Sequence, residues 1–238
     1  KRRPAKPFAL MSAALEDVYK YAYVEQDEQA VLVSPLAPIV LLRKRTNGII
    51  ADSVAPDVNT FGVMLAYAPL HHLLLRHNFP ALVMTSGNIS GEPVICTNEE
   101  ALQYLSGTAD YFVLHDRDIL KRSDDSIMRF SGGNRIILRR SRGLIPRPVH
   151  LERQVKPILA FGSHEKNTVC MTKDKYAHVS RYIGDLSRLR TLENAGEEIE
   201  ELKKTLGIEP AAVACDLHPD YGSSRMAERR SEVPLIRV

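Results

Sequence analysis

The sequence predicts a mixed α/β fold, of the α+β kind, in one or two domains. Short β-rich runs alternate with helical stretches along the 238 residues, which is typical of sheets covered by helices. Apolar residues make up 44% and charged residues 26% of the chain, and the mean hydropathy of -0.19 is that of a chain with an ordinary core. The most apolar stretch, residues 62–75, is interrupted by Pro69, His71 and His72, which excludes a transmembrane helix.

Three helices are predicted in the first part of the chain. An apolar face at helical spacing follows Ser12, whose hydroxyl is a suitable cap: Leu15, Val18, Tyr19 and Ala22. Residues 69–77 predict a short second helix. Thr97 and Glu100 form a capping box for a third helix at residues 99–105. Short apolar runs predict strands at residues 30–33, 38–42, 81–84, 111–114 and 135–138, with the run at 81–84 expected to be buried.

A connector is predicted between residues 146 and 157, where three prolines bracket a polar stretch. We therefore expect a first domain at residues 1–150 and a second at 156–238. Past the connector, a meander of three strands is expected at residues 158–161, 168–171 and 176–181. A helix over residues 189–206 should end at Gly207, followed by a strand at 211–215 and a helix at 223–230.

The cysteines and the charge limit the class of protein. Cys96, Cys170 and Cys215 are far apart and belong to no ligand motif, which favours a reducing cytoplasm and argues against zinc. A net charge of +3 is too small by itself to indicate nucleic acid. The chain opens on Lys1 without a signal peptide, and we interpret it as a piece of a longer polypeptide.

Two clusters in the first domain are candidate anion-binding elements. Lys1, Arg2, Arg3 and Lys6 place four cations in six residues, which indicates either phosphate binding or a frayed terminus. Residues 85–93 follow a predicted strand and are rich in glycine, hydroxyl and amide groups. Such a loop allows a close approach to a nucleotide, although ordinary polar turns have the same composition.

Further charged clusters follow in the first domain. Residues 115–118 and 122–126 alternate acids and bases, which suits either magnesium binding or pairing on the surface. Residues 139–143 carry three arginines, whose guanidinium groups suit phosphate. The competing interpretation, a nucleic-acid patch, lacks interleaved aromatic residues for base stacking.

The second domain has two candidate elements, each after a predicted strand. The loop at residues 162–168 can present backbone N–H groups, Lys166 and Thr168 to phosphates, but its spacing is not that of a Walker loop. Asp216 and His218 follow the later strand. We expect capping or turn formation there rather than a metal site.

Taken in order, these segments resemble the HypF family, carbamoyltransferases that mature nickel-iron hydrogenases. In that family a YrdC-like (Sua5-like) domain, a twisted mixed sheet with helices, precedes an actin-like ATPase (Kae1-like) domain. The segments that carry the likeness are residues 1–9, 62–75, 85–93, 115–126, 141–143, 165–168, 183–186 and 215–221. The resemblance implies an N-terminally truncated YrdC-like domain and only the N-terminal portion of a Kae1-like domain. Zinc or iron is then expected only in parts of the parent protein that are missing here.

The resemblance also implies a reaction and its residues. The YrdC-like half makes carbamoyl adenylate from carbamoyl phosphate and ATP with Mg²⁺, and the Kae1-like half passes the carbamoyl group to the C-terminal cysteine of a HypE-like partner. Catalytic roles fall on Lys1 and Arg3. The expected nucleotide and phosphate contacts are Ser86, Asn88, Ser126, Arg139 and Arg142, with Lys166, Thr168 and Asp216 in the Kae1-like half.

Two alternative functions stay open at this point. A threonylcarbamoyl-adenylate synthase of tRNA modification shares the Lys-x-Arg and Ser-x-Asn elements, although the Kae1-like segment argues against it. A double-stranded RNA-binding module would use the basic residues at 1–6 and 139–142. Such binding would depend steeply on salt and not on ATP.

Overall fold

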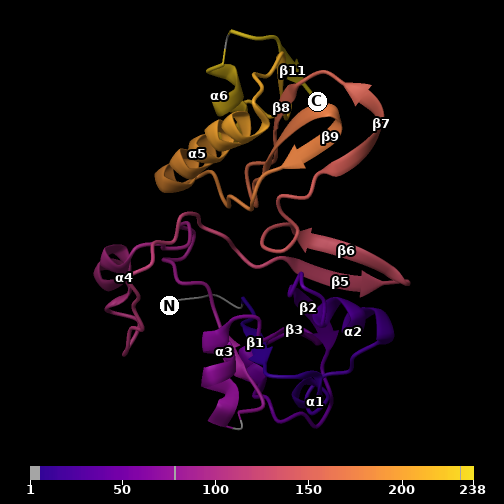
Figure 1. Cartoon of the computed structure of the whole chain (residues 1–238), viewed down its shortest axis with the longest axis vertical. Helices are drawn as coiled ribbons and strands as arrows, with labels where there is room; N and C mark the ends of the chain where they lie inside the picture. The colour runs from indigo at the N-terminus through magenta and orange to yellow at the C-terminus, as the bar shows by residue number, and fades with distance from the viewer. Residues whose placement is uncertain (1–5, 78, 231) are drawn as a thin grey trace. The chain divides into compact units, whose positions relative to one another are not determined.

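The computed structural model describes residues 6–77, 79–230 and 232–238, which form two compact units (Figure 1). The first unit contains the chain up to residue 86 together with residues 125–144. The second contains residues 87–124 and 145–238. The units therefore do not follow the order of the chain, because a segment from the first predicted domain belongs to the second unit.

The first unit is built on a six-stranded mixed sheet in the order β4-β1-β3-β2-β5-β6. β1 pairs in parallel with β3, and β2 with β5, while the other neighbours are antiparallel. The strands are β1 (Ala9–Ser12), β2 (Ile39–Arg43), β3 (Thr60–Leu65), β4 (Leu82–Met84), β5 (Ile127–Ser131) and β6 (Asn134–Arg139).

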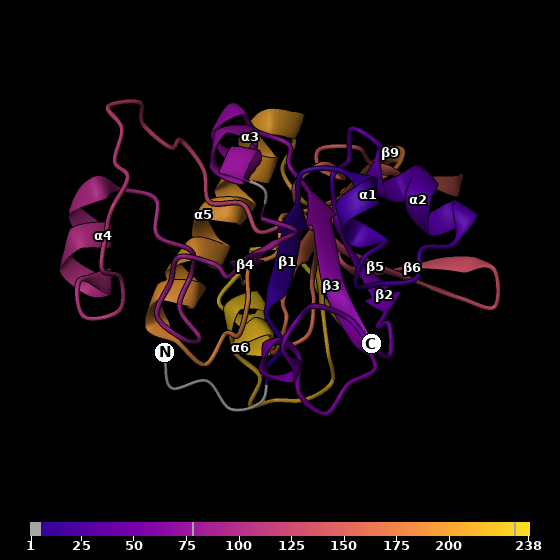
Figure 2. The same ribbon diagram turned by 90° about the horizontal axis from the view of Figure 1, so that it is seen from below.

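Helices cover both faces of this sheet (Figure 2). Side chains alternate between faces along a strand, so Leu10 enters one apolar cluster and Met11 the other. Helices α1 (Leu15–Val18) and α2 (Gln26–Leu32) pack on the larger cluster through Val18 and Leu32. Helix α3 (Pro69–Leu74) leads into the 3₁₀ turn η2 (Leu75–His77), which closes the smaller cluster. A second 3₁₀ turn, η1, spans Asp52–Val54.

The second unit has a five-stranded mixed sheet in the order β11-β10-β8-β9-β7. The long helix α5 packs on it through Ala195 and Ile199, which are buried with Leu159, Met171 and Val213. The elements are α4 (Asn98–Leu105), β7 (Val149–Val155), β8 (Ile158–Phe161), β9 (Val169–Val179), α5 (Leu189–Leu206), β10 (Ala212–Cys215), α6 (Gly222–Glu228) and β11 (Leu235–Arg237). In the part of the chain that the structure describes, no helix has the length and apolarity to cross a bilayer.

The predicted fold class is confirmed, and so are most of the elements. The strands expected at 38–42, 135–138, 158–161 and 211–215 are β2, β6, β8 and β10. The helices expected at 69–77, 99–105, 189–206 and 223–230 are α3 with η2, α4, α5 and α6. The backbone N–H of Glu100 donates to the Thr97 hydroxyl, as the capping motif predicts.

Two of the predicted strands are wrong. Residues 30–33 fall at the end of α2, because Glu25 and Glu28 form a capping box that starts a helix. Residues 111–114 form no strand, and the Tyr111 side chain is 92% exposed. The strand at 81–84 exists as β4, but it lies at the sheet edge with Val83 half exposed rather than buried.

Three further local predictions need correction. The segments 168–171 and 176–181 belong to a single long strand, β9, rather than two. The stretch at 146–157, expected to be a connector, contains β7, which pairs with β9. Ser12 is the last residue of β1 and caps no helix, because its hydroxyl bonds the Tyr21 hydroxyl and the Pro80 carbonyl, each at 2.7 Å.

Candidate functional site

The glycine-rich loop at residues 85–93 leaves the first sheet beside the start of β1. Met84 at the end of β4 is paired with Ala9, and the two strands are antiparallel. Thr85 and Ser86 therefore emerge where residues 6–8 enter the sheet. Lys1 and Arg3, the predicted catalytic cations a few positions earlier, lie outside the described residues.

Internal hydrogen bonds hold the glycine-rich loop in a closed shape. The Asn88 amide nitrogen donates to the Glu92 carbonyl at 2.6 Å. The Ile95 N–H donates to the Gly87 carbonyl at 2.9 Å, which closes the loop at its base. Gly91 has a φ of 85°, a left-handed conformation that favours glycine. Asn88 therefore fixes the loop, whereas Ser86 is exposed at its start.

Arg142 is held at the opposite end of the same sheet. Its Nε and Nη2 donate to Asp125 Oδ1 at 3.0 and 2.7 Å, and Nη2 also donates to the Ala37 carbonyl at 2.7 Å. The guanidinium lies 3.7 Å from the centre of the Tyr67 ring. These contacts fix the plane of the guanidinium, which is what an anion-binding arginine needs.

His71 lies against the Tyr67 ring, and its surroundings lower its pKa. The two rings meet edge-on with centroids 4.5 Å apart, and the buried Nδ1 of His71 has no partner among the described residues. Burial has the largest effect on the pKa of His71 and lowers it; the charge of Asp125 opposes this shift, and the Arg142 charge adds to it. Burial, followed by the charge of Asp125, raises the pKa of Tyr67. The cluster thus combines the Arg142–Asp125 ion pair with the rings of Tyr67 and His71.

Ser126 shapes the turn that carries Arg142. Its buried hydroxyl donates to the Arg142 carbonyl at 2.8 Å and accepts from the Ser141 N–H at 2.9 Å. Gly143 has a φ of 84°, and a Cβ there would lie 2.3 Å from the Leu36 carbonyl oxygen. Only glycine fits this position, which explains Gly143 by the geometry of the turn.

The structure divides the predicted nucleotide residues of the first unit between the two ends of the sheet. Ser86 follows β4 at one end, whereas Ser126, Arg139 and Arg142 lie at the other, where β5 begins and β6 ends. β1 is four residues long, so these ends are about 13 Å apart along the strands at 3.3 Å per residue. β4 and β5 are also four strand positions apart, about 19 Å across the sheet at 4.8 Å per strand, so a single phosphate cannot contact both groups of residues.

The predicted residues of the second unit lie together at one end of its parallel strands. β8 and β10 are parallel, so the hairpin at 162–168 and Asp216 leave the sheet on the same side. Lys166 occupies the turn with a φ of 51° and is exposed. A Cβ on Gly162 would lie 2.4 Å from the Thr168 carbonyl oxygen, so the base of this hairpin requires glycine.

Three rings form a stack at this end of the strands, which the sequence does not predict. Tyr221 stacks on His218 at 4.2 Å and on His164 at 5.4 Å between centroids. The Nδ1 atoms of His164 and His218 accept backbone N–H groups of Gly222 and Asp220, at 3.0 and 3.2 Å. The signal in the sequence is a histidine three residues after the end of each of two neighbouring parallel strands, β8 and β10.

The histidines of this stack do not form a metal centre. Because each Nδ1 accepts a hydrogen bond, the neutral ring carries its proton on Nε2 and has no lone pair left for a metal. His164 Nε2 lies 3.9 Å from Asp185, whose pKa is lowered chiefly by the Ser187 N–H that its carboxylate accepts. Among the described residues, no three histidine, cysteine or acidic side chains gather in a way that suits a metal ion.

Two protein-family models match the chain in succession. The Sua5/YciO/YrdC family, described as "Telomere recombination", matches residues 1–141. The HypF Kae1-like domain matches residues 153–238. The first model covers more than half of the chain.

Curated relatives match nearly the whole chain. Carbamoyltransferase HypF of Synechocystis sp. is 41% identical over 232 residues, which is 97% of this chain and 30% of that protein. Carbamoyltransferase HypF2 of Cupriavidus necator is 42% identical over 260 residues, 100% of this chain and 32% of the relative. The chain therefore spans about a third of the length of these relatives.

Solved structures give the same result. A full-length HypF in the phosphate- and nucleotide-bound form is 44% identical, with a TM-score of 0.95 over 100% of this chain and 31% of that one. HypF of T. kodakarensis is 39% identical, with a TM-score of 0.94 over 99% of this chain and 31% of that one. P. abyssi Sua5, complexed with L-threonine, has a TM-score of 0.52 at 13% identity over 99% of this chain and 83% of its own, which shows a shared fold alone.

Proposed function

The chain belongs to the HypF family, as a YrdC-like part followed by a Kae1-like part, and we propose that it forms carbamoyl adenylate for carbamoyl transfer. The observation that carries the proposal is the order of the two matched domains in one chain, at residues 1–141 and 153–238. A threonylcarbamoyl-adenylate synthase or an RNA-binding module needs no Kae1-like domain. Relatives about 41% identical over nearly the whole chain are named carbamoyltransferases.

The proposed reaction activates a carbamoyl group with ATP. A carboxylate oxygen of carbamate, derived by hydrolysis of carbamoyl phosphate, attacks the α-phosphorus, and the bond to pyrophosphate breaks. Lys1 and Arg3 neutralise the charge that moves onto the departing pyrophosphate, while Ser86 and Asn88 orient the nucleotide. These roles follow the family resemblance, and the closed shape of the loop around Asn88 supports them.

Arg142 and Arg139 are proposed to bind phosphate at the end of the sheet opposite Ser86. Asp125 and the Ala37 carbonyl accept hydrogen bonds from Nε and Nη2 of Arg142, which hold its guanidinium in one orientation for an anion. Ser126 contributes through the turn it holds.

Magnesium is proposed to arrive with ATP. Mg²⁺ usually keeps several waters and binds phosphate oxygens with one or two carboxylates, so the lack of a three-ligand cluster in the described residues is compatible with it. When bound, it would neutralise phosphate charge. In the second unit, the proposed nucleotide contacts are Lys166, Thr168 and Asp216. The proposed acceptor of the carbamoyl group is a cysteine thiolate at the C-terminus of a partner protein.

ATP–pyrophosphate exchange tests the proposed activity. The chain is incubated with ATP, magnesium and labelled pyrophosphate, and with either carbamoyl phosphate, carbamate equilibrated from ammonium bicarbonate, or L-threonine plus bicarbonate. We expect exchange with the carbamoyl sources and none that requires threonine. Exchange that depends on threonine would assign the chain to the threonylcarbamoyl-adenylate synthases of tRNA modification. Binding of duplex RNA without any exchange would favour the RNA-binding alternative.

A further inference from the structure

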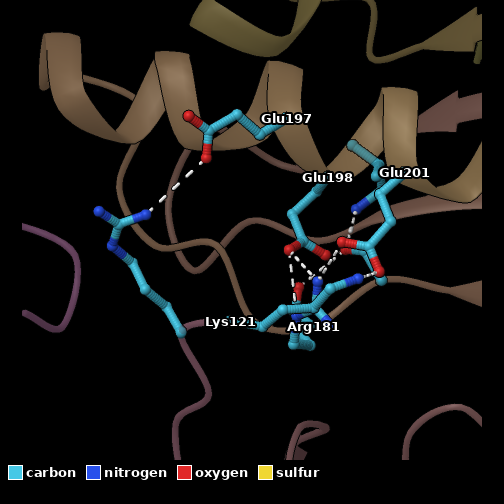
Figure 3. Close-up of polar contacts among 8 residues, drawn as sticks. Lys121, Arg181, Glu197, Glu198 and Glu201 are labelled. Atoms are coloured by element: carbon cyan, nitrogen blue, oxygen red, sulfur yellow. Dashed lines mark hydrogen bonds and ion pairs between the residues drawn. The ribbon is translucent and has the colours of Figure 1, made fainter. Parts of the chain in front are cut away.

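Residues 87–124 are attached to the second unit chiefly by polar contacts with α5 (Figure 3). Lys121 pairs with Glu201, and Arg122 lies 3.8 Å from Glu197. At the other end of the segment, Glu100 of α4 pairs with Arg190 in the first turn of α5. Three ion pairs thus span about three turns of one helix.

The acidic side of this interface is organised by the second unit itself. Arg181, just after β9, donates to Glu198 at 2.5 Å and to Glu201 at 2.9 Å. The Arg181 and Glu198 side chains are only 17% and 13% exposed. Glu201 is therefore held in place before Lys121 contacts it, which lowers the entropy cost of the contact with the segment.

Hydrophobic burial contributes little to holding the segment. α4 has no buried residue, and the side chains of Tyr111, Val113 and Leu120 are 92%, 77% and 89% exposed. Among the described residues, 87–124 contain no strand. The position of the segment consequently depends on its ion pairs, assisted by Arg190, whose guanidinium lies 5.3 Å from the centre of the Tyr104 ring.

The segment begins with the loop that contains Asn88. Gly91 of this loop lies close to the start of α5, since a Cβ on it would be 3.7 Å from Arg188 Nε. The loop is followed, after a few residues, by α4 and its Glu100–Arg190 pair. A shift of α4 on α5 therefore moves the backbone that carries Asn88.

We propose that α5 of the Kae1-like part positions the Asn88 loop for nucleotide binding through these ion pairs. Arg190 and Glu201 are then positioning residues for adenylation, although the sequence assigns them to the other domain. This inference rests on the proposed function. Because the paired side chains are partly exposed, the expected effect of breaking one pair is modest, about fivefold in the KM for ATP, with little change in kcat.

A charge swap tests the role of α5 directly. The variants are Arg190→Glu, Glu100→Arg and the double variant, with Lys121→Glu as a second break. Lys121→Glu leaves the Arg181 contacts of Glu201 intact. Lys203→Glu is the matched control, because it breaks the pairs of Lys203 with Glu200 of α5 and with Glu209 just beyond the helix, without touching the segment. The readouts are kinetic constants for ATP in the exchange assay, Kd for ATP by calorimetry, and hydrogen exchange of residues 87–105.

We expect each single reversal to raise the KM and Kd for ATP and to speed hydrogen exchange, the double variant to restore most of both, and the control to match wild type. Reversals that free the segment without changing ATP binding would overturn the proposal, as would reversals that change neither. If wild type binds ATP but performs no exchange, the proposed function fails, while the Kd values still decide the positioning role. A wild-type chain that binds no ATP overturns both.

Discussion

At the residue scale, Gly143 is required for the turn that holds Arg142. Its φ of 84° and the 2.3 Å separation between a would-be Cβ and the Leu36 carbonyl are two independent reasons for glycine. Gly133 has a similar φ of 75°, but nothing lies within 4 Å of a Cβ there. At Gly133 only the backbone conformation therefore favours glycine. The pair allows steric overlap to be separated from backbone strain.

Gly143→Ala is expected to lower the free energy of unfolding by about 3 kcal/mol and to weaken ATP binding, because Leu36 and the turn must move apart. Gly133→Ala should cost about 1 kcal/mol and leave ATP binding unchanged. Urea denaturation and calorimetry measure both. Equal costs for the two substitutions would show that the Leu36 contact does not matter.

Asn88→Ala is expected to reduce carbamoyl-dependent exchange at least about tenfold, because the loop loses the bond from the Asn88 amide to the Glu92 carbonyl. The melting temperature should change little, since the loop is largely exposed. Lys1→Ala in the parent protein is expected to give the same loss with an intact fold. Wild-type exchange rates in both variants would refute the assignment of the nucleotide residues.

His71 predicts a pH dependence of stability. Burial lowers its pKa in the folded chain, so the unfolded chain binds the proton more readily and stability falls as the pH drops below about 6.5. His71→Phe keeps a ring against Tyr67 and removes the titration. Denaturation at pH 7.5 and 5.5 should show that the free energy of unfolding falls less between the two pH values in the variant than in wild type. An identical fall in both would argue against a lowered pKa of His71 in the folded chain.

At the element scale, local signals predicted the helices well and the strands less well. The helix at α5 followed from an apolar face and Gly207, which adopts a φ of 64° at the C-cap. Residues 30–33 of α2 are a short apolar run, which predicts a strand, whereas the capping box that starts the helix lies before them, at Glu25 and Glu28. The division of β9 into two strands came from turn-forming residues around Asp174, which has a φ of 53° within a continuous strand.

Gly207→Ala is expected to destabilise the second unit by about 1 kcal/mol, because alanine resists the left-handed conformation that ends α5. Nothing lies within 4 Å of a Cβ there, so the cost is one of backbone conformation. Gly196→Ala, inside the same helix and equally open, should instead stabilise it slightly. Thermal denaturation of both variants checks the sign, and a shift in the same direction for both would contradict this explanation.

At the scale of the whole molecule, the sequence identified the family and the mixed fold, but not how the segments assemble. Ordered motifs such as Ser86-x-Asn88 and Ser141-Arg142-Gly143 are local and can be recognised along the chain. The attachment of residues 87–124 to α5 depends on ion pairs between residues as far apart as Glu100 and Arg190. The ring stack of His164, Tyr221 and His218 likewise depends on which strands are neighbours, which spacing along the chain does not reveal.

The central claim is that this chain activates a carbamoyl group as an adenylate. Mass spectrometry of the nucleotide product, formed from ATP with carbamoyl phosphate, threonine and bicarbonate all present, tests it most directly. We expect carbamoyl adenylate as the product, and at least about tenfold less of it from the Asn88→Ala variant. Threonylcarbamoyl adenylate as the product would contradict the account.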